Sequence, residues 1–345
     1  MKKSHILFLL ILSFVFIQET DALFSQTRSQ SLTVAWYNVE NLFDTKNDSY
    51  PGDDEFTPKG EKNWTRDRLH EKYQGLTKVI GLMNAGQGPD LLGLSEIEHR
   101  SVLERWNNKY LKQFKYGIAY HESPDLRSID LGLFYRKSIF RHIATQGHTI
   151  DLGPDERPTR DVTVFTLVAG DDTLDCILVH WPSRYGGKEQ SEPKRISAAE
   201  VTAQVVDSLY AIRQNDDILI MGDFNDDPDD SSVRDYLQAQ DMVPGTDPGR
   251  RLYNAMTDVH SNPVEGTYYY RGEWNTLDQI ILGRGMFDEK GFGSEYPDAS
   301  VFVQQFMRVQ EGEYKDAPYR TYVGPRYLGG ISDHFPILLT INLYN

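Results

Sequence analysis

The sequence predicts a single α/β or α+β domain in which layered sheets carry helices on their outer faces. Strand-like and helix-like segments mix along the whole chain, and no Pro- or Ser-rich linker divides it. The 345 residues and the 39% hydrophobic content are enough to bury a sizeable core. We therefore expect one domain over residues 26–345, preceded by a short segment of a different kind.

Residues 1–25 have the layout of a secretory signal peptide. Lys2 and Lys3 precede an apolar run over residues 6–17, and small and polar residues follow. The run is shorter than the roughly 20 apolar residues of a membrane span. Cleavage after Ala22 or after Ser25 fits equally well, and an uncleaved anchor is the alternative. We expect export to the periplasm or the medium, without a stable membrane span.

The remaining elements follow from hydrophobic periodicity. A helix is predicted from Thr65, its N-cap, to about residue 83, and a second over residues 193–212. The segments 266–272 and 276–283 are expected to pair with each other. Further strands are predicted over residues 32–38, 89–98, 129–136, 173–181, 218–222 and 335–343.

Charge and cysteine content narrow the function classes. The net charge is −15, from 51 acidic and 36 basic residues. Such a chain is not an obvious general DNA binder, although bound cations could let it act on a phosphate ester. The lone Cys176 cannot form an intramolecular disulfide, and its apolar flanks predict a buried structural thiol.

The stretch "ILIMGDFNDDPDDSS" over residues 218–232 carries many carboxylates directly after an apolar strand. It could be a solvated turn or a cation site. An EF-hand is excluded because Pro228 and Arg234 stand where that loop needs Gly and Glu. Asp227, Asp229 and Asp230 are expected in a solvated turn, with Ser231 as a helix cap.

Chemically active side chains recur at strand ends. A single Asp after a strand is usually a turn or cap residue, and a lone His is often a satisfied core residue. A whole set at one edge of a rigid sheet instead indicates an active site. "LLGLSEIE" and "ILIMGDFN" are both apolar strands that end in acid after a helix, which suggests two units facing each other. The strand-end set is Asn38, Glu96, His180, Asp223, Asn225, Asp278, Asp333 and His334.

Six motifs in this order resemble the endonuclease/exonuclease/phosphatase superfamily: "WYNVENLF", "LSEIE", "LVHWPSR", "MGDFND", "TLDQIIL" and "SDHFPI". The resemblance runs from about Leu32 to the C-terminus. It implies a deoxyribonuclease I-like α+β fold, a four-layer αββα sandwich of two mixed, mainly antiparallel sheets. It also implies a Mg²⁺-dependent phosphoesterase, with Mn²⁺ as an alternative ion.

The resemblance also implies roles for individual residues. Glu96 would be the principal metal ligand, with Asn38 beside it and Asp333 helping to hold that ion or a second one. Asp223 would position or deprotonate the attacking water, and Asn225 would donate to a phosphoryl oxygen. His180 and His334 would contact the scissile phosphate. Asp278 would accept a hydrogen bond from His334 and fix its tautomer.

Other positions leave alternatives open. Arg127 and Asp130 are candidate substrate-side residues, and Glu98 could support Glu96 or face solvent. Glu98 also stands two positions after Glu96, where the deoxyribonuclease pattern has an Arg, which argues against reading of duplex DNA. The acidic loop 44–62 could cover the site as a flap or could be a mobile surface loop.

Three functions follow in order of preference. The first is an exported Mg²⁺-dependent phosphodiesterase with endonuclease-like hydrolysis of a P–O bond. The second is a phosphatase or a lipid-headgroup phosphodiesterase on the same fold. The third is a non-catalytic binding domain, which predicts the loss of at least one of the strand-end residues. The expected partner is a phosphate ester, whether nucleic acid, small diester or phospholipid headgroup, and the chain is expected to be a monomer.

Overall fold

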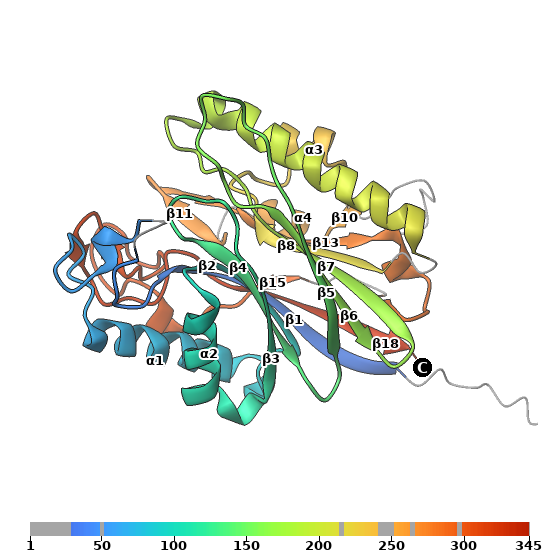
Figure 1. The fold of residues 1–345 in the computed structure, drawn as a ribbon, viewed down its shortest axis with the longest axis horizontal. Helices are drawn as coiled ribbons and strands as arrows, with labels where there is room; N and C mark the ends of the chain where they lie inside the picture. Colours follow the sequence, from blue (N-terminus) through green and yellow to red (C-terminus); the bar gives the residue numbers. More distant parts are fainter. Residues whose placement is uncertain are drawn as a thin grey trace, which may run out of the picture.

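The computed structural model describes residues 29–48, 52–213, 217–240, 252–262, 266–294 and 299–344. The predicted signal peptide, residues 1–25, lies outside the described residues. Two large sheets form the centre of the molecule (Figure 1).

The first sheet has the strand order β14-β18-β1-β2-β4-β3, and β15 also pairs with β18. Among its described pairs, β1 and β2 run parallel and the others are antiparallel. Its strands are β1 (Ser29–Leu42), β2 (Leu91–Ile97), β3 (Tyr116–His121), β4 (Asp130–Arg136), β14 (Phe292–Gly293), β15 (Ser300–Val301) and β18 (Ile337–Tyr344).

The second sheet has the order β5-β6-β7-β8-β13-β10-β9. Here β7 and β8 run parallel, as do the short strands β9 and β10, and the other described pairs are antiparallel. Its strands are β5 (Arg141–His148), β6 (Val162–Ala169), β7 (Asp172–His180), β8 (Ile218–Asp223), β9 (Ala239–Gln240), β10 (Leu252–Asn254) and β13 (Asp278–Gly283).

Helices cover the outer face of each sheet. α1 (Arg66–Leu82) and α2 (Arg100–Lys109) pack on the first sheet in one core cluster, and α3 (Lys188–Ile212) packs on the second sheet in another. A third cluster, with Trp36, Leu178 and Ile280, fills the space between the sheets. The predicted four-layer αββα sandwich of two mixed, mainly antiparallel sheets is confirmed (Figure 1).

The smaller elements lie in the connections. They are the hairpin β11 (Tyr268–Tyr270) and β12 (Glu273–Asn275), the hairpin β16 (Tyr322–Val323) and β17 (Arg326–Tyr327), and α4 (Thr257–His260). Short helical turns cover Asp54–Phe56, Asn84–Gly86, Lys112–Phe114, Ser232–Tyr236, Arg284–Phe287 and Gln305–Met307. Among the described helices, none is both long enough and apolar enough to cross a bilayer.

The predicted pairing of residues 266–272 with residues 276–283 is wrong. β13, which covers most of the second segment, lies between β8 and β10 in the second large sheet. β11, in the first segment, pairs with β12 in a hairpin of its own. The two segments are neighbours in sequence, but the buried β13 takes its partners from the core of the sheet.

Two helix boundaries can be compared with the sequence. Thr65 caps α1 as predicted, and its hydroxyl accepts a hydrogen bond from the Arg68 backbone N–H. The second helix begins at Lys188, five residues before the predicted start at Pro193. Arg195 stabilises this extra turn, because its guanidinium donates to the Lys188 carbonyl and to the Ser191 hydroxyl.

The two parallel strand pairs have the same plan. α1 connects β1 to its parallel neighbour β2, and α3 connects β7 to its parallel neighbour β8. β2 and β8 also contact each other across the interface between the sheets. The carboxyl ends of β1, β2, β7 and β8 can therefore contribute side chains to one place, as ends of parallel strands commonly do.

Candidate functional site

The sheet register brings the strand-end residues together. His180, at the end of β7, is the parallel partner of Asp223, at the end of β8. Asp278, the first residue of β13, is the antiparallel partner of the same Asp223. In the other sheet, Asn38 in β1 is opposite Ser95, the residue before Glu96. Each large sheet thus contributes its central parallel strand pair to the site.

The carboxylate of Asp223 is the centre of this group. The Asn38 amide nitrogen donates to Asp223 Oδ2 over 3.0 Å. His180 Nε2 and His334 Nε2 lie 3.6 and 3.7 Å from the same oxygen. Asp223 itself is 2% exposed. Three side chains from three chain segments thus converge on one buried carboxylate oxygen.

A hydrogen-bonded chain fixes His334. His334 Nδ1 lies 2.6 Å from Asp278 Oδ2, and the indole nitrogen of Trp36 donates to Asp278 Oδ1 over 2.8 Å. The ring of Tyr268 packs on the imidazole, with ring centroids 4.8 Å apart. The carboxylate of Asp278 therefore holds the proton on Nδ1 and directs Nε2 towards Asp223.

The two histidines have opposite electrostatic surroundings. Burial lowers the pKa of His180 well below its ordinary value, and the nearby Arg160 and Arg127 lower it further. Burial also acts to lower the pKa of His334, but the carboxylates of Asp278 and Asp223 outweigh it and raise that pKa well above its ordinary value. One imidazole is thus kept neutral while the other is kept protonated.

The carboxyl group of Asp223 has a shifted pKa as well. Burial raises this pKa to about 7, although the charge on His334 acts in the opposite direction. A carboxyl group with a pKa near neutrality can accept a proton in one step and release it in another. Pairs of groups whose pKa values are displaced in opposite directions are typical of acid–base sites.

Glu96 stands at a backbone irregularity next to this centre. Its φ angle is +63°, and the pairing of β2 with β4 shifts register between Ser95 and Ile97. Asn38 donates to Glu96 Oε1 over 3.2 Å, and the Asn41 backbone N–H donates to Oε2 over 2.8 Å. A non-Gly residue held in this conformation is a sign of a constrained, functional position.

The oxygen donors of this region suit a hard divalent cation. The half-buried Glu96 carboxylate keeps lone pairs beyond its two hydrogen bonds, as does the partly exposed carboxylate of Asp333. Asn38 presents its nitrogen to Glu96 and Asp223, while its Oδ1 accepts from the Glu40 backbone N–H. Mg²⁺ prefers such carboxylate oxygens together with water. One ligand atom from each of Asp223, Asp278 and His334 also lies within 4.8 Å of the others, but the protonated His334 has no free lone pair for a cation.

The side chains of the last two predicted residues have partners other than Asp223. The Asn225 backbone N–H donates to Asp223 Oδ1, and its side-chain amide donates to the Trp181 carbonyl over 3.0 Å. Asp333 forms an ion pair with Arg320 at 3.9 Å and acts on His334 electrostatically. The other six predicted residues form one contiguous network around Asp223.

Two residues that support the site are not signalled by the sequence. Trp36 is the first residue of the motif "WYNVENLF" in β1, but nothing in that motif marks its indole as the partner of Asp278. The buried Arg160 donates to the His180 and Trp181 carbonyls and to Asp125. Arg160 ends the loop sequence "DERPTR", residues 155–160 between β5 and β6, which carries no recognisable pattern. Arg160 could therefore be found only from its three-dimensional contacts.

The two candidate substrate-side residues have structural partners. Arg127 forms an ion pair with Asp125 at 3.2 Å. Asp130 is 3% exposed and accepts hydrogen bonds from Tyr120 and from the backbone and hydroxyl of Ser123. Asp130 therefore stabilises the turn before β4.

The acidic stretch after β8 is mostly buried, so the expected solvated turn is wrong for Asp227. Its side chain is 10% exposed, accepts from the Thr276 backbone N–H and pairs with Arg184 at 2.9 Å. Arg184 also pairs with Asp230 at 3.1 Å. Ser231 makes no capping hydrogen bond, and its hydroxyl donates to Glu192 instead. Asp229 is 71% exposed, as expected for a solvated turn. The stretch thus supplies Asp223 to the site, and Asp227 and Asp230 fix the loop.

The acidic loop 44–62 packs against the core in its described part. Phe56 is 5% exposed and stacks on Phe43 with ring centroids 4.2 Å apart. The Trp64 indole donates to the Phe43 carbonyl over 3.0 Å. Glu98 is fully buried beneath this loop, so the interpretation of Glu98 as a solvent-facing residue is wrong.

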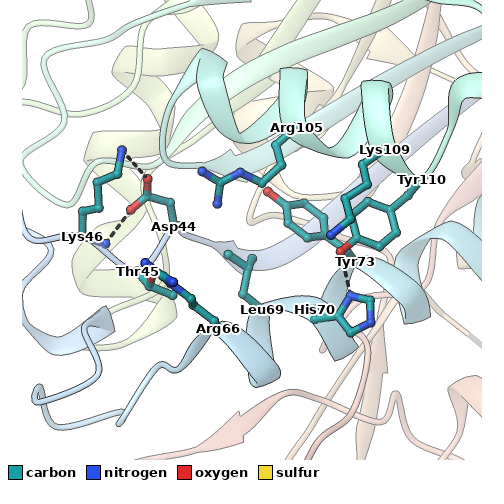
Figure 2. A pocket seen from close by; sticks show the side chains of 10 residues that line it. All are labelled: Asp44, Thr45, Lys46, Arg66, Leu69, His70, Tyr73, Arg105, Lys109 and Tyr110. Carbon is teal, nitrogen blue, oxygen red and sulfur yellow. Dashed lines mark hydrogen bonds and ion pairs between the residues drawn. The ribbon is translucent and has the colours of Figure 1, made fainter.

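A separate cavity of about 450 Å³ lies between α1, α2 and the start of this loop (Figure 2). None of the eight predicted site residues lines it. Lysine and arginine side chains and two tyrosine rings are among the residues that line it. The full lining is Asp44, Thr45, Lys46, Arg66, Leu69, His70, Tyr73, Arg105, Lys109 and Tyr110.

Solved structures with the same fold are similar to this chain over most of its length. An endonuclease/exonuclease/phosphatase family protein from Bacteroides thetaiotaomicron is 16% identical, with a TM-score of 0.58, and the match covers 92% of this chain and 96% of that one. TDP2 of D. rerio, complexed with a single-strand DNA product, is 16% identical with a TM-score of 0.55, covering 90% and 99%. A mannosyl-6-phosphatase of Bacteroides thetaiotaomicron is 14% identical with a TM-score of 0.51, covering 90% and 99%.

No curated protein sequence matches the chain. The sequence model of the Endonuclease/Exonuclease/phosphatase family, in contrast, matches residues 33–343. That span contains nearly all of both sheets, all three covering helices and the whole network around Asp223. The chain therefore belongs to the endonuclease/exonuclease/phosphatase family and has its phosphoesterase fold.

Proposed function

We propose that the protein is an exported, Mg²⁺-dependent phosphodiesterase that hydrolyses a P–O bond of a phosphate diester. The observation that carries the proposal is the convergence of Asn38, His180 and His334 on Asp223 Oδ2. A phosphoryl transfer needs a base for water and fixed donors for the phosphoryl oxygens. This cluster supplies both kinds of group within one buried site.

Asp223 is the proposed base. Its pKa of about 7, raised by burial, allows it to take a proton from the attacking water near neutral pH. The oxygen of that water forms the new bond to phosphorus while the bond to the leaving oxygen breaks. The protonated His334 donates a hydrogen bond to a phosphoryl oxygen or a proton to the leaving oxygen. The neutral His180 and the amide of Asn225 complete the set of groups around the phosphate.

The cation would be held by the carboxylates of Glu96 and Asp333, with Asn38 fixing Glu96 beside it. A bound divalent cation neutralises charge on the phosphoryl oxygens and lowers the pKa of water. Mn²⁺ has the same preference for oxygen ligands and is the alternative ion.

A phosphatase is the second candidate, because one similar structure is a mannosyl-6-phosphatase. A lipid-headgroup diester is a further substrate of the same chemistry. The net charge of −15 and the glutamate at position 98 favour a small or lipid substrate over long duplex DNA.

The test is metal-dependent release of nitrophenol from bis-nitrophenyl phosphate and from nitrophenyl phosphate. We expect Mg²⁺-dependent cleavage of the diester that a chelator abolishes and that Asp223→Ala and His334→Ala each eliminate. Cleavage of the monoester alone would replace the diesterase with a phosphatase. If neither ester is cleaved, and no member of a panel of oligonucleotides and phospholipids is cleaved either, the proposed phosphodiesterase is replaced by a non-catalytic binding domain.

Export is tested separately. Residues 1–25 carry the proposed signal peptide, so protein recovered from the periplasm or medium of a bacterial host should begin at Leu23 or Gln26. N-terminal sequencing of that fraction gives the result directly. Recovery in the cytoplasm with Met1 intact would contradict export.

A further inference from the structure

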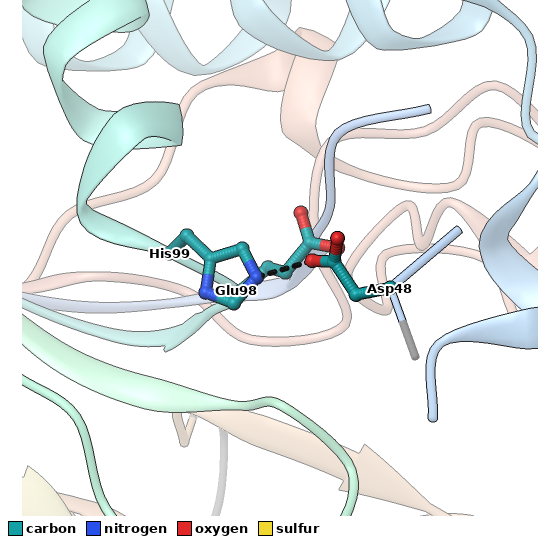
Figure 3. Close-up of side chains that lie close together, drawn as sticks. All are labelled: Asp48, Glu98 and His99. Carbon is teal, nitrogen blue, oxygen red and sulfur yellow. Dashed lines mark hydrogen bonds and ion pairs between the residues drawn. The ribbon is translucent and has the colours of Figure 1, made fainter. Parts of the chain in front are cut away.

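Four side chains form a second polar cluster, outside the network around Asp223. They are Asp48 and Asp53 in the loop after β1, and Glu98 and His99 directly after β2; we call them the loop cluster. His99 Nε2 lies 2.5 Å from Asp48 Oδ2. One ligand atom from each of Asp48, Glu98 and His99 lies within 4.8 Å of the others (Figure 3).

Two carboxylate oxygens in this cluster are buried without a partner. Glu98 is 0% exposed; its Oε2 accepts from the Asp44 backbone N–H over 2.5 Å, but its Oε1 accepts from no group in the described chain. Asp53 is 2% exposed; its Oδ1 accepts from the Asp48 backbone N–H, and its Oδ2 likewise has no described donor. A buried carboxylate without a donor or counter-ion is costly, so an additional positive group is expected here.

We propose that the loop cluster binds a divalent transition-metal ion, Zn²⁺ or Mn²⁺. Asp48 Oδ2, Glu98 Oε1 and His99 Nε2 would be the ligands, and Asp53 would be the adjacent carboxylate. One imidazole with carboxylates is a mixed nitrogen and oxygen set, which suits these ions better than Ca²⁺ or Mg²⁺.

The surroundings of the cluster meet two further needs of a metal site. His99 Nδ1 lies 3.6 Å from Glu122, whose carboxylate can orient the ring from behind, as outer carboxylates do for metal-binding histidines. The side chains of Asp48 and His99 are 39% and 25% exposed, so an ion can enter from solvent. The bound ion would tie the loop after β1 to the end of β2.

The experiment uses the full chain with Glu96→Gln, which removes the main ligand of the proposed catalytic ion. Mn²⁺ binding is followed by the loss of the free-ion EPR signal, and Zn²⁺ binding by calorimetry. We expect one ion per chain and a rise of the unfolding midpoint with Zn²⁺ or Mn²⁺, because an ion that binds only the folded state stabilises it. Ca²⁺ at the same concentration should give a smaller shift.

Ligand variants are then made in this background. Glu98→Gln, Asp48→Asn and His99→Gln should each weaken binding roughly tenfold or more. Glu61→Gln removes one exposed carboxylate from the same loop and should leave binding unchanged. Circular dichroism checks the fold, and the partly exposed His99 provides a variant that does not disturb the buried core.

Three results would overturn the proposal. The Glu96→Gln chain could bind no transition-metal ion, in which case a proton shared by Glu98 and Asp53 is the occupant. The ion could bind equally well to all three ligand variants, which would place it elsewhere. Tighter binding of Ca²⁺ would show that His99 is not a ligand. None of these results depends on phosphoesterase activity, so this test is independent of the proposed function.

Discussion

His334 and Asp278 form the shortest polar contact of the site network, with 2.6 Å between Nδ1 and Oδ2. The two residues are 56 positions apart in sequence, and each is at most 6% exposed. Asp278 accepts a second hydrogen bond from Trp36, so its orientation is fixed from the facing sheet. The ionisation of His334 is therefore controlled by a residue whose own position depends on both sheets.

Asp278→Asn tests this relationship. The amide cannot stabilise the imidazolium, so the pKa of His334 should fall and activity should decrease by roughly 10²- to 10⁴-fold in kcat. The sign of the pH effect follows: activity that needs protonated His334 should be lost at a lower pH in the variant than in the wild type. The measurement is kcat against pH with the nitrophenyl diester.

Asp229→Asn is the matched control for Asp278→Asn. Its side chain is 71% exposed and lies outside the site network, so its pH profile should match that of the wild type. An Asp278→Asn variant with reduced kcat but an unchanged pH profile would contradict the assigned role of Asp278.

The buried ion pair of Arg195 and Asp226 gives a prediction about stability. Arg195 Nε lies 2.6 Å from Asp226 Oδ2, and both side chains are at most 1% exposed. Arg195→Ala leaves the carboxylate buried without its main counter-ion and should lower the free energy of unfolding by about 3–5 kcal/mol. Urea denaturation measures this change.

An exposed pair provides the comparison for Arg195→Ala. Arg234 and Asp235 are both 51% exposed, so Arg234→Ala should change the free energy of unfolding far less than Arg195→Ala does. Equal effects of the two variants would show that burial of the Arg195 pair does not matter.

The sequence indicates the site residues at the strand ends but not the residues that hold them in position. Asn38, Glu96, His180, Asp223 and Asp278 are predictable because polar residues at the ends of apolar strands form a local pattern. Trp36 donates to Asp278 across 242 positions, and no local pattern predicts such a contact.

The local sequence pattern also does not predict which strands pair or which charged side chains are buried. Adjacent strand-like segments favour a hairpin, but β13 takes β8 and β10 as its neighbours because its apolar residues belong in the core. The polar neighbours of Asp227 predict exposure to solvent. Its partner Arg184 lies 43 positions earlier, so the burial of this carboxylate depends on tertiary structure.

The thiol of Cys176 should be inert in the folded protein. The side chain is 0% exposed, and burial together with the charge of Asp175 raises the thiol pKa above its ordinary value. An aromatic disulfide reagent should label almost no thiol in native protein at pH 8 and one thiol per chain in urea. Rapid labelling without urea would mean that β7 opens locally.

Asp130 should make stability depend on pH in the acid range. Burial raises its pKa to about 6, from 3.8 in an unfolded chain, and the hydrogen bonds from Ser123 only partly oppose this. Between these values the folded state holds a proton that the unfolded state has released. Unfolding then releases a proton, and the free energy of unfolding falls as pH rises from about 4 to about 6.

Asp130→Asn removes this titration while keeping one acceptor oxygen for Ser123 or Tyr120. The wild type should therefore lose stability relative to the variant between pH 4 and pH 7, by an amount on the order of 2–3 kcal/mol. Urea denaturation of both proteins at the two pH values measures the difference, and the overall stability of the variant does not affect it. A difference that stays constant or grows in favour of the wild type would show that Asp130 is ionised at pH 4 in the folded protein.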